Sequence, residues 1–192
     1  MDERTLIDSI AKGDNYAFSV LVNEYKNKIF NTTLGIVQHY EDAEDLTQEV
    51  FIEIFQSIVH FKGESKLSTW IYRITLTKSL EFLRKKKRKK RFAPVLSLFG
   101  KNNVLQEINK NYFHHPGVEL ENKEKAAILF NAIDKLAENQ KTAFLLHKTE
   151  QLSYNEIAEI MQITIPSVES LMFRAKQNLQ KLLGDYYEKN EK

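Results

Sequence analysis

Glycine and proline are scarce in this chain, and their scarcity restricts what the chain can fold into. The 192 residues contain 6 Gly and 3 Pro, too few for the many tight turns of an all-β fold. Four of these nine residues (Pro94, Gly100, Pro116 and Gly117) fall between residues 93 and 122. We therefore predict an all-α protein with two small helical domains, residues 1–92 and 123–186, a flexible linker over residues 93–122 and a tail over residues 187–192.

The composition and the motifs argue against an enzyme. The chain has no Cys, which excludes disulfides, thiolate metal sites and cysteine nucleophiles. Its five His, at positions 39, 60, 114, 115 and 147, show no metal-ligand spacing, and no glycine-rich phosphate loop is present. We therefore expect no catalytic site, no metal and no cofactor.

No segment has the character of a membrane anchor. The longest stretch without an acid, Lys or Arg spans residues 29–40, well short of the roughly 18 apolar residues that a membrane helix needs. The N-terminus opens acidic and lacks the basic and apolar regions of a secretory signal. We expect a cytoplasmic protein without membrane insertion.

Charge is distributed very unevenly. Residues 84–91 are eight consecutive bases, whereas residues 29–61 contain no Lys or Arg and six acids. The net charge of +2 therefore conceals a strongly basic segment in an otherwise acidic chain. Such segregation indicates a polyanion bound at one place and a basic partner at another, although a solvated charged face is the simpler alternative.

An acidic strip accompanies the clearest helical pattern, over residues 42–58. Leu46, Val50, Ile54 and Ile58 recur every four residues, and Phe51 and Phe55 widen this apolar stripe. At about 100° per residue, four acids share the opposite face: Asp42, Asp45, Glu49 and Glu53. Because like charges at helical spacing repel each other, their clustering suggests a binding use.

Two aromatic residues after Gly63 are flanked by basic residues. We predict a helix that begins there, with Ser65, Ser68 or Thr69 as its N-cap, and continues into the basic run. Trp70 and Tyr72 could stack on bases while nearby cations (Lys62, Lys66 and Arg73) hold phosphates. The alternative is that these aromatic residues belong to the core.

The last third of the chain has the pattern of a helix-turn-helix. Ser153 and Glu156 form a predicted capping box for a short helix, and residues 162–164 form a tight turn. Pro166 suits the first turn of a longer second helix with one apolar and one polar-basic face. In this arrangement the second helix enters the major groove of DNA. An ordinary helical hairpin is the alternative.

Three stretches together resemble the extracytoplasmic-function sigma factors, the small two-domain promoter-specificity subunits of bacterial RNA polymerase, within the sigma-70 family. They are residues 42–51 (DAEDLTQEVF), residues 61–74 with FKGE followed by STWIYRI, and residues 152–176 from LSY to FRAK. The resemblance covers nearly the whole chain. It implies a factor that binds core polymerase and directs promoter recognition, melting and transcription initiation.

The resemblance also implies roles for individual residues. Docking on the β′ coiled coil of core polymerase falls on Asp42, Asp45, Gln48 and Glu49. Capture of the minus-ten promoter element, with a flipped base, falls on Phe61, Lys62, Ser65, Lys66, Thr69, Trp70, Arg73, Thr77, Lys78 and Arg84. Reading of the minus-thirty-five element falls on Ser167, Glu169, Ser170, Phe173, Arg174 and Lys176. The β flap of the polymerase and an anti-sigma factor are the further partners that the family implies.

The chain departs from the family pattern at several positions. Thr77 stands where many members have Asn, and Glu169 and Leu171 stand where many have bases, so no known promoter sequence transfers to this chain. Gln162 occupies a turn position where Gly is common. Two other functions remain open: a stand-alone helix-turn-helix regulator, which would not need the acidic strip, and a helical interaction protein with a basic nuclear-import or RNA-binding tail.

Overall fold

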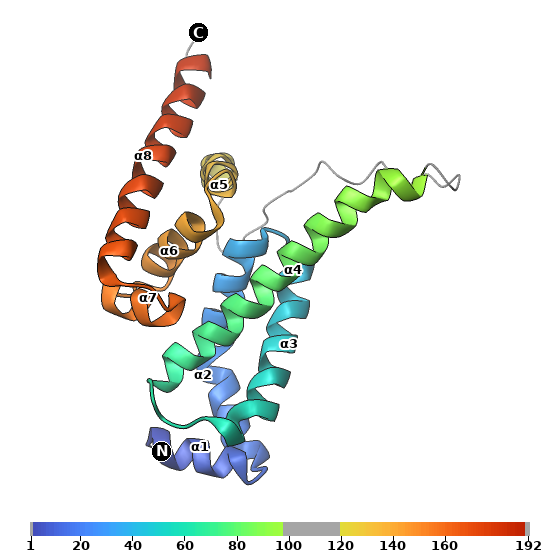
Figure 1. Cartoon of the computed structure of the whole chain (residues 1–192), viewed down its shortest axis with the longest axis vertical. Helices are drawn as coiled ribbons and strands as arrows, with labels where there is room; N and C mark the ends of the chain where they lie inside the picture. Colours follow the sequence, from blue (N-terminus) through green and yellow to red (C-terminus); the bar gives the residue numbers. More distant parts are fainter. Residues whose placement is uncertain (1, 98–119, 191–192) are drawn as a thin grey trace.

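The computed structural model describes residues 2–97 and 120–190, and every regular element in these ranges is a helix (Figure 1). The first range holds α1 (Glu3–Ala11), α2 (Asn15–Val37), α3 (Tyr40–Ser57), the 3-10 helix η1 (Ile58–His60) and α4 (Leu67–Ser97). The second holds α5 (Leu120–Asp134), α6 (Glu138–Thr149), α7 (Tyr154–Met161) and α8 (Ile165–Asn190). The predicted all-α class is confirmed.

The first four helices enclose one apolar cluster. Its centre consists of side chains with no exposed area, among them Leu21, Ile29, Val50, Ile54 and Ile71. Most of the apolar stripe predicted for residues 42–58 faces this core, whereas Leu46 is buried in the second cluster of the protein. Phe55 is 40% exposed at the edge of the stripe.

Short polar caps begin the first two helices. Asp2 accepts a hydrogen bond from the Thr5 amide (2.8 Å) and Asp14 from the Tyr16 amide (2.8 Å). Between them, Gly13 has a φ of +86°, in the left-handed region that glycine adopts without strain. The chain can therefore turn sharply from α1 into α2.

The N-cap predicted for α4 is wrong. The helix begins at Leu67, so Ser68 and Thr69 lie inside it. The Leu67 amide donates instead to Glu3 Oε1 (3.2 Å), and the Ser65 hydroxyl donates to a neighbouring carbonyl. A carboxylate from α1 thus satisfies the exposed amide at the start of α4, a solution that local sequence does not show.

Helices α4 and α5 enter the predicted linker at its two ends. Residues 93–97 continue α4 and residues 120–122 begin α5, while residues 98–119 lie outside the described ranges. Pro94 removes one backbone donor without ending the helix. The domain boundaries at residues 92 and 123 stay predictions.

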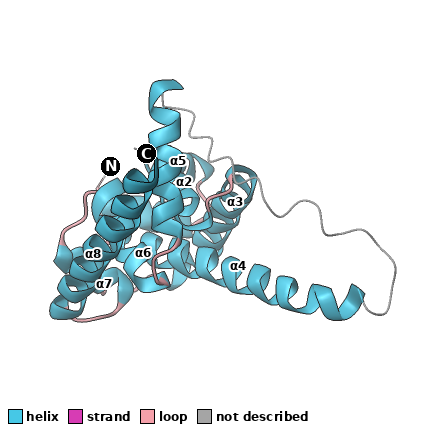
Figure 2. Ribbon diagram, turned by 90° about the horizontal axis from the view of Figure 1, so that it is seen from above, coloured by secondary structure: helices cyan, strands magenta, loops and turns pink. Residues whose placement is uncertain are grey.

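The two halves of the chain share a core. Leu34, Leu76, Leu145, Ile157 and Met172, from α2, α4, α6, α7 and α8, belong to one buried cluster. We call the contact of α2 and α4 with α6 and α7 the seam. Beyond it, α4 extends away from the other helices (Figure 2).

Candidate functional site

The ends of the acidic strip are neutralised by α4. Asp42 Oδ2 lies 2.6 Å from Lys86 Nζ, and Glu53 Oε2 lies 2.9 Å from Lys78 Nζ. Both pairs join α3 to α4, whose apolar faces pack side by side. Asp42, one of the predicted docking residues, and Lys78, one of the predicted minus-ten residues, are therefore engaged within the molecule.

The middle of the strip is free. Asp45, Gln48 and Glu49 are exposed, and their side chains make no hydrogen bond or ion pair with any other described residue. Ile52 follows one turn later and is 56% exposed. The sequence analysis did not single out Ile52, although its position outside the apolar stripe indicated an outward-facing side chain. Acidic, amide and apolar groups thus form one open surface on α3.

Phe61 and Trp70 meet where the loop before α4 joins the helix. Their ring centroids are 5.2 Å apart and their planes are inclined by 51°. Both rings are half-buried, and Trp70 also packs against the core of the first four helices. Trp70 therefore contributes to the core and keeps part of its ring accessible, so the two alternatives for this residue are compatible.

Several of the predicted minus-ten residues surround one hollow. Its volume is about 400 Å³, and its lining includes the predicted Trp70, Arg73, Thr77 and Lys78. Glu53 of the acidic strip also lines it, together with Ile74 and Glu81, which the sequence analysis missed. Their signal is helical spacing, because Ile74 and Glu81 each follow a predicted residue by four positions. Lys62 and Lys66 are exposed in the loop, Ser65 is half-buried and Arg84 is exposed further along α4. Thr69 is only 2% exposed and does not reach this surface.

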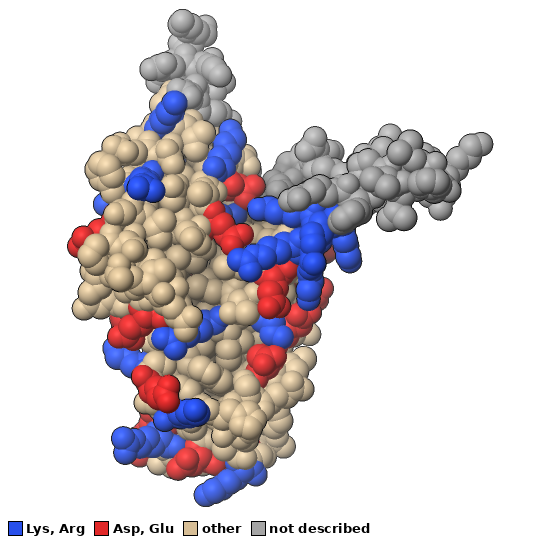
Figure 3. Space-filling view, in the orientation of Figure 1, with Lys and Arg blue, Asp and Glu red and all other residues tan. Residues whose placement is uncertain are grey.

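Basic side chains gather further along α4. Figure 3 shows them where α4 extends from the body of the molecule, beside the residues that are not described. The basic run of residues 84–91 lies in this part of the helix. Most residues that line the hollow beside Trp70 also belong to α4. Aromatic, polar and cationic groups therefore follow one another along a single helix.

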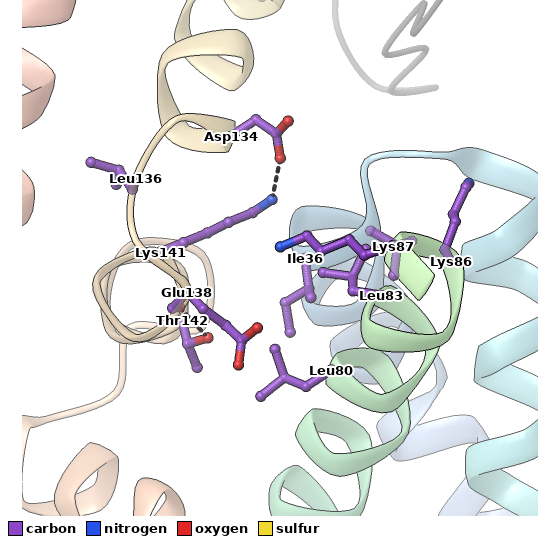
Figure 4. Close-up of a pocket in the computed structure, with 11 residues that line it drawn as sticks. Ile36, Leu80, Leu83, Lys86, Lys87, Asp134, Leu136, Glu138, Lys141 and Thr142 are labelled. Atoms are coloured by element: carbon purple, nitrogen blue, oxygen red, sulfur yellow. Dashed lines mark hydrogen bonds and ion pairs between the residues drawn. The ribbon is translucent and has the colours of Figure 1, made fainter. Parts of the chain in front are cut away.

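A second hollow lies at the seam. It measures about 240 Å³ and is lined by three lysines and two acids, together with apolar residues. Figure 4 shows Lys87 reaching toward Lys141, whose Nζ is 2.7 Å from Asp134 Oδ1. Burial lowers the pKa of Lys141, while Asp134 opposes the shift. The charges are mixed, and the arrangement favours no particular ligand.

The helix-turn-helix forms as predicted. The Glu156 amide donates to Ser153 Oγ (3.3 Å) and the Ser153 amide donates to Glu156 Oε2 (3.0 Å), which completes the capping box. Gln162 ends α7 with a φ of +55°. This left-handed conformation explains why a glycine suits the position better.

The second helix of this motif, α8, has a buried and an exposed face. Val168, Met172, Ala175 and Leu179 are buried against the core. All six residues predicted to read DNA lie on the exposed side: Ser167, Glu169, Ser170, Phe173, Arg174 and Lys176. Phe173 is 61% exposed, which is unusual for an aromatic side chain without a partner surface. The Ser167 hydroxyl is hydrogen-bonded to that of Thr164 (2.8 Å) at the start of the helix.

Other kinds of site are not evident in the described ranges. Within them, no group of three or more His, Asp or Glu side chains is arranged to hold a metal ion. No helix there is long and apolar enough to span a membrane.

Comparisons with known proteins agree with this geometry. The family description "Sigma-70 region 2" matches residues 21–89, and "Sigma-70, region 4" matches residues 126–179. The chain is 32% identical to the ECF RNA polymerase sigma-E factor of Haemophilus influenzae, over 94% of each chain. It is 30% identical to the RNA polymerase sigma-H factor of Pseudomonas aeruginosa, over 94% of this chain and 93% of the relative.

Two solved structures share the fold. CnrH, in complex with the cytosolic domain of CnrY, matches with a TM-score of 0.69 at 18% identity, over 95% of this chain and 97% of the other. The sigma factor RpoE of Bartonella quintana, in complex with the anti-sigma factor NepR, matches with a TM-score of 0.61 at 19% identity, over 87% and 96%. The match to region 2 disfavours a stand-alone helix-turn-helix regulator. The chain belongs to the sigma-70 family and is an RNA polymerase sigma factor of the extracytoplasmic-function type.

Proposed function

We propose that this sigma factor docks on core RNA polymerase through the free acids of α3. Asp45 and Glu49, with Gln48 between them, would contact the basic coiled coil of the β′ subunit. The observation that carries this proposal is a contrast along one helix, because the flanking acids Asp42 and Glu53 are paired with α4 and the central ones are not. Unpaired like charges that face solvent favour a cationic partner.

The test is a charge reversal with a matched control. The double variant Asp45→Lys, Glu49→Lys should lose core-polymerase affinity by about 10-fold or more, because it turns attraction into repulsion. The control variant, Asp8→Lys with Glu24→Lys, makes the same change of charge at exposed positions on α1 and α2. It should bind as the wild type does. Equal affinity of both double variants, with unchanged thermal melting, would refute the docking surface.

The hollow beside Trp70 is the proposed site for the melted minus-ten element. A half-exposed aromatic ring can stack on an unpaired base, and Arg73 and Lys78 lie where phosphates of the same strand would pass. Lys78 would have to exchange Glu53 for a phosphate. The exposed cations Lys62 and Lys66 would hold the strand at the end of the hollow.

The exposed face of α8 is the proposed reader of the minus-thirty-five element. Its fork-shaped Arg174 can address a guanine with two hydrogen bonds, and Phe173 can contact a thymine methyl group. Region 4 would also rest on the β flap of the polymerase.

An anti-sigma factor is the further partner that we infer. Of the two solved structures above, the one from Bartonella quintana is described as a complex with an anti-sigma factor. We also place this chain in the cytoplasm, since a specificity subunit acts where the bacterial polymerase transcribes. We assign it no catalytic activity of its own. Co-purification of the tagged chain with polymerase and with a second, regulatory protein would test both partners.

A further inference from the structure

The loop that precedes α4, residues 61–66, has its backbone hydrogen bonds at its two ends. At the beginning, the Phe61 amide donates to a carbonyl of η1 (3.0 Å), and at the end the Trp70 amide donates to the Lys66 carbonyl (3.2 Å). Inside the loop, the Ser65 hydroxyl makes only a long bond of 3.4 Å to the carbonyl that follows it. The conformation of the loop therefore depends on how η1 and α4 hold its ends.

Helix α1 contacts both ends of this loop. It packs on η1, and its buried residues share an apolar cluster with Ile58 of η1 and Leu67 of α4. Glu3 Oε1 of α1 also accepts the hydrogen bond from the Leu67 amide, across 64 residues of sequence. Figure 1 shows α1 below the segment that joins η1 to α4. The first helix thus supports the loop from one side.

Glu3 supplies a cap that the residues around the start of α4 do not supply. The first amides of a helix have no helical partner, and a side-chain oxygen from the preceding residue usually accepts one of them. Here that residue is Lys66, whose side chain has no acceptor. A carboxylate also suits the partial positive charge at the start of a helix. Glu3 therefore stabilises the beginning of α4 at Leu67.

The beginning of α4 controls the proposed minus-ten site. Trp70 lies in the first turn of α4, and its ring meets that of Phe61 at the opposite end of the loop, with 5.2 Å between the centroids. If the first turn unwinds, the Trp70 amide loses its bond to the Lys66 carbonyl and the loop becomes longer. The two rings then lose their fixed relation. A site that is already ordered binds more tightly, because binding does not have to order it.

We propose that Glu3 is a positioning residue for capture of the minus-ten element. It fixes the first turn of α4, and with it the loop from Phe61 to Lys66, in the conformation that receives the unpaired base. Glu3 acts through the Leu67 amide and makes no contact with DNA. This inference rests on the proposed function of the hollow beside Trp70, and it gives α1 a role in that function.

The test compares carboxylate caps on two helices. Glu3→Ala removes the acceptor at the start of α4, whereas Glu3→Gln keeps an oxygen that can accept the same amide. The control is Asp14→Ala, which removes the cap of α2, where Asp14 accepts the Tyr16 amide (2.8 Å). Each of the three variants loses one negative charge, but only Glu3→Ala removes the cap of α4. Thermal melts measure how much stability each variant loses.

Strand opening by the holoenzyme is the first readout. In Glu3→Ala, permanganate reactivity of promoter thymines should fall by about 3- to 10-fold, as expected when a helix start loses its cap. Affinity of the holoenzyme for a single-stranded oligonucleotide with the minus-ten sequence should fall by a similar factor, because the defect lies in capture. Both should stay near wild type in Glu3→Gln and Asp14→Ala. Affinity for core polymerase should be unchanged in all three variants.

Three outcomes would overturn the proposal. They are normal strand opening by Glu3→Ala, an equal loss in Asp14→Ala at equal loss of stability, and a loss in Glu3→Gln as large as in Glu3→Ala. If Glu3→Ala fails to fold, Glu3→Asp replaces it, because it keeps the charge and withdraws the acceptor by one methylene group. Trp70→Ala identifies failure of the proposed function: that variant would then open promoters normally as well. If only Glu3→Ala does so, the positioning role alone is refuted.

Discussion

The hydroxyl of Tyr72 donates a hydrogen bond of 2.8 Å to Glu150 Oε2, and this contact joins region 2 and region 4 inside their shared interface. Burial is the largest cause of a raised pKa at both groups. The hydrogen bond from Tyr72 partly opposes the shift at Glu150. A carboxylate that binds its proton more tightly in the closed state links the seam to pH.

The first prediction is that acid stabilises the closed seam. Because the pKa of Glu150 is raised in the closed state, its stabilising contribution is complete below the ordinary carboxyl pKa and is lost as pH rises through the raised value. Around it, the Tyr72 hydroxyl donates to the carboxylate, and the charge of Lys28 lowers its pKa. Thermal melting against pH should show this step in the wild type and not in Glu150→Gln. Identical pH profiles would contradict the assignment.

The second prediction concerns the bond itself. Tyr72→Phe leaves a buried carboxylate without its donor, so we expect a loss of about 1–3 kcal/mol in unfolding free energy. Replacing both partners, Tyr72→Phe with Glu150→Leu, should recover most of that loss because no unpaired polar atom remains. Urea denaturation of the two single variants and the double variant measures the coupling. Strictly additive losses would show that the two groups do not interact.

Helical faces were predictable because each depends on nearby residues alone. The repeat that contains Val50 and Ile54 identified the buried side of α3, and Ser153 with Glu156 identified the start of α7. Both signals lie within one or two helical turns, where residue spacing determines which side chains share a face.

Contacts between distant segments could not be predicted in the same way. Asp42 and Lys86 are 44 residues apart in the chain, and periodicity does not indicate which helix covers which face. For the same reason, neither the contact of Glu3 with the start of α4 nor the seam of α2 and α4 with α6 and α7 could be predicted. In the sequence, Asp42 and Asp45 are equivalent members of the acidic strip. Only tertiary packing distinguishes them, because it pairs Asp42 with Lys86 and leaves Asp45 exposed.

The third prediction tests the capping box of α7. Ser153→Ala removes the acceptor for the Glu156 amide and should cost about 0.5–2 kcal/mol. Since the Glu159 carbonyl of α7 accepts hydrogen bonds from Arg73 of α4, the variant should also loosen the seam. Hydrogen exchange of α6 and α7 amides should accelerate more than that of α2. Equal acceleration throughout would indicate a global effect only.

The fourth prediction separates the two roles of Trp70. Trp70→Ala removes both the ring that could stack on a base and its packing on Phe61, so we expect lower thermal stability and weaker promoter melting. Trp70→Phe keeps an aromatic face and should retain most of both. Permanganate footprints beside thermal melts give the two readouts. Normal strand opening by a destabilised Trp70→Ala variant would assign the residue to the core alone.

The last prediction concerns how α8 distinguishes sequences. Arg174 is exposed on the outward face of the helix, where its guanidinium can donate two hydrogen bonds to a guanine edge. Such a pair is worth about 1–3 kcal/mol of discrimination, whereas a lysine on a phosphate strengthens binding to every sequence alike. Arg174→Ala should therefore flatten the preference among minus-thirty-five variants, and Lys176→Ala should weaken all of them equally. Titrations at several salt concentrations distinguish the two roles, because losing one phosphate contact reduces the salt slope by about one unit. A uniform loss with a reduced slope for Arg174→Ala would make Arg174 a phosphate contact and leave base reading to Ser170, Phe173 and Glu169.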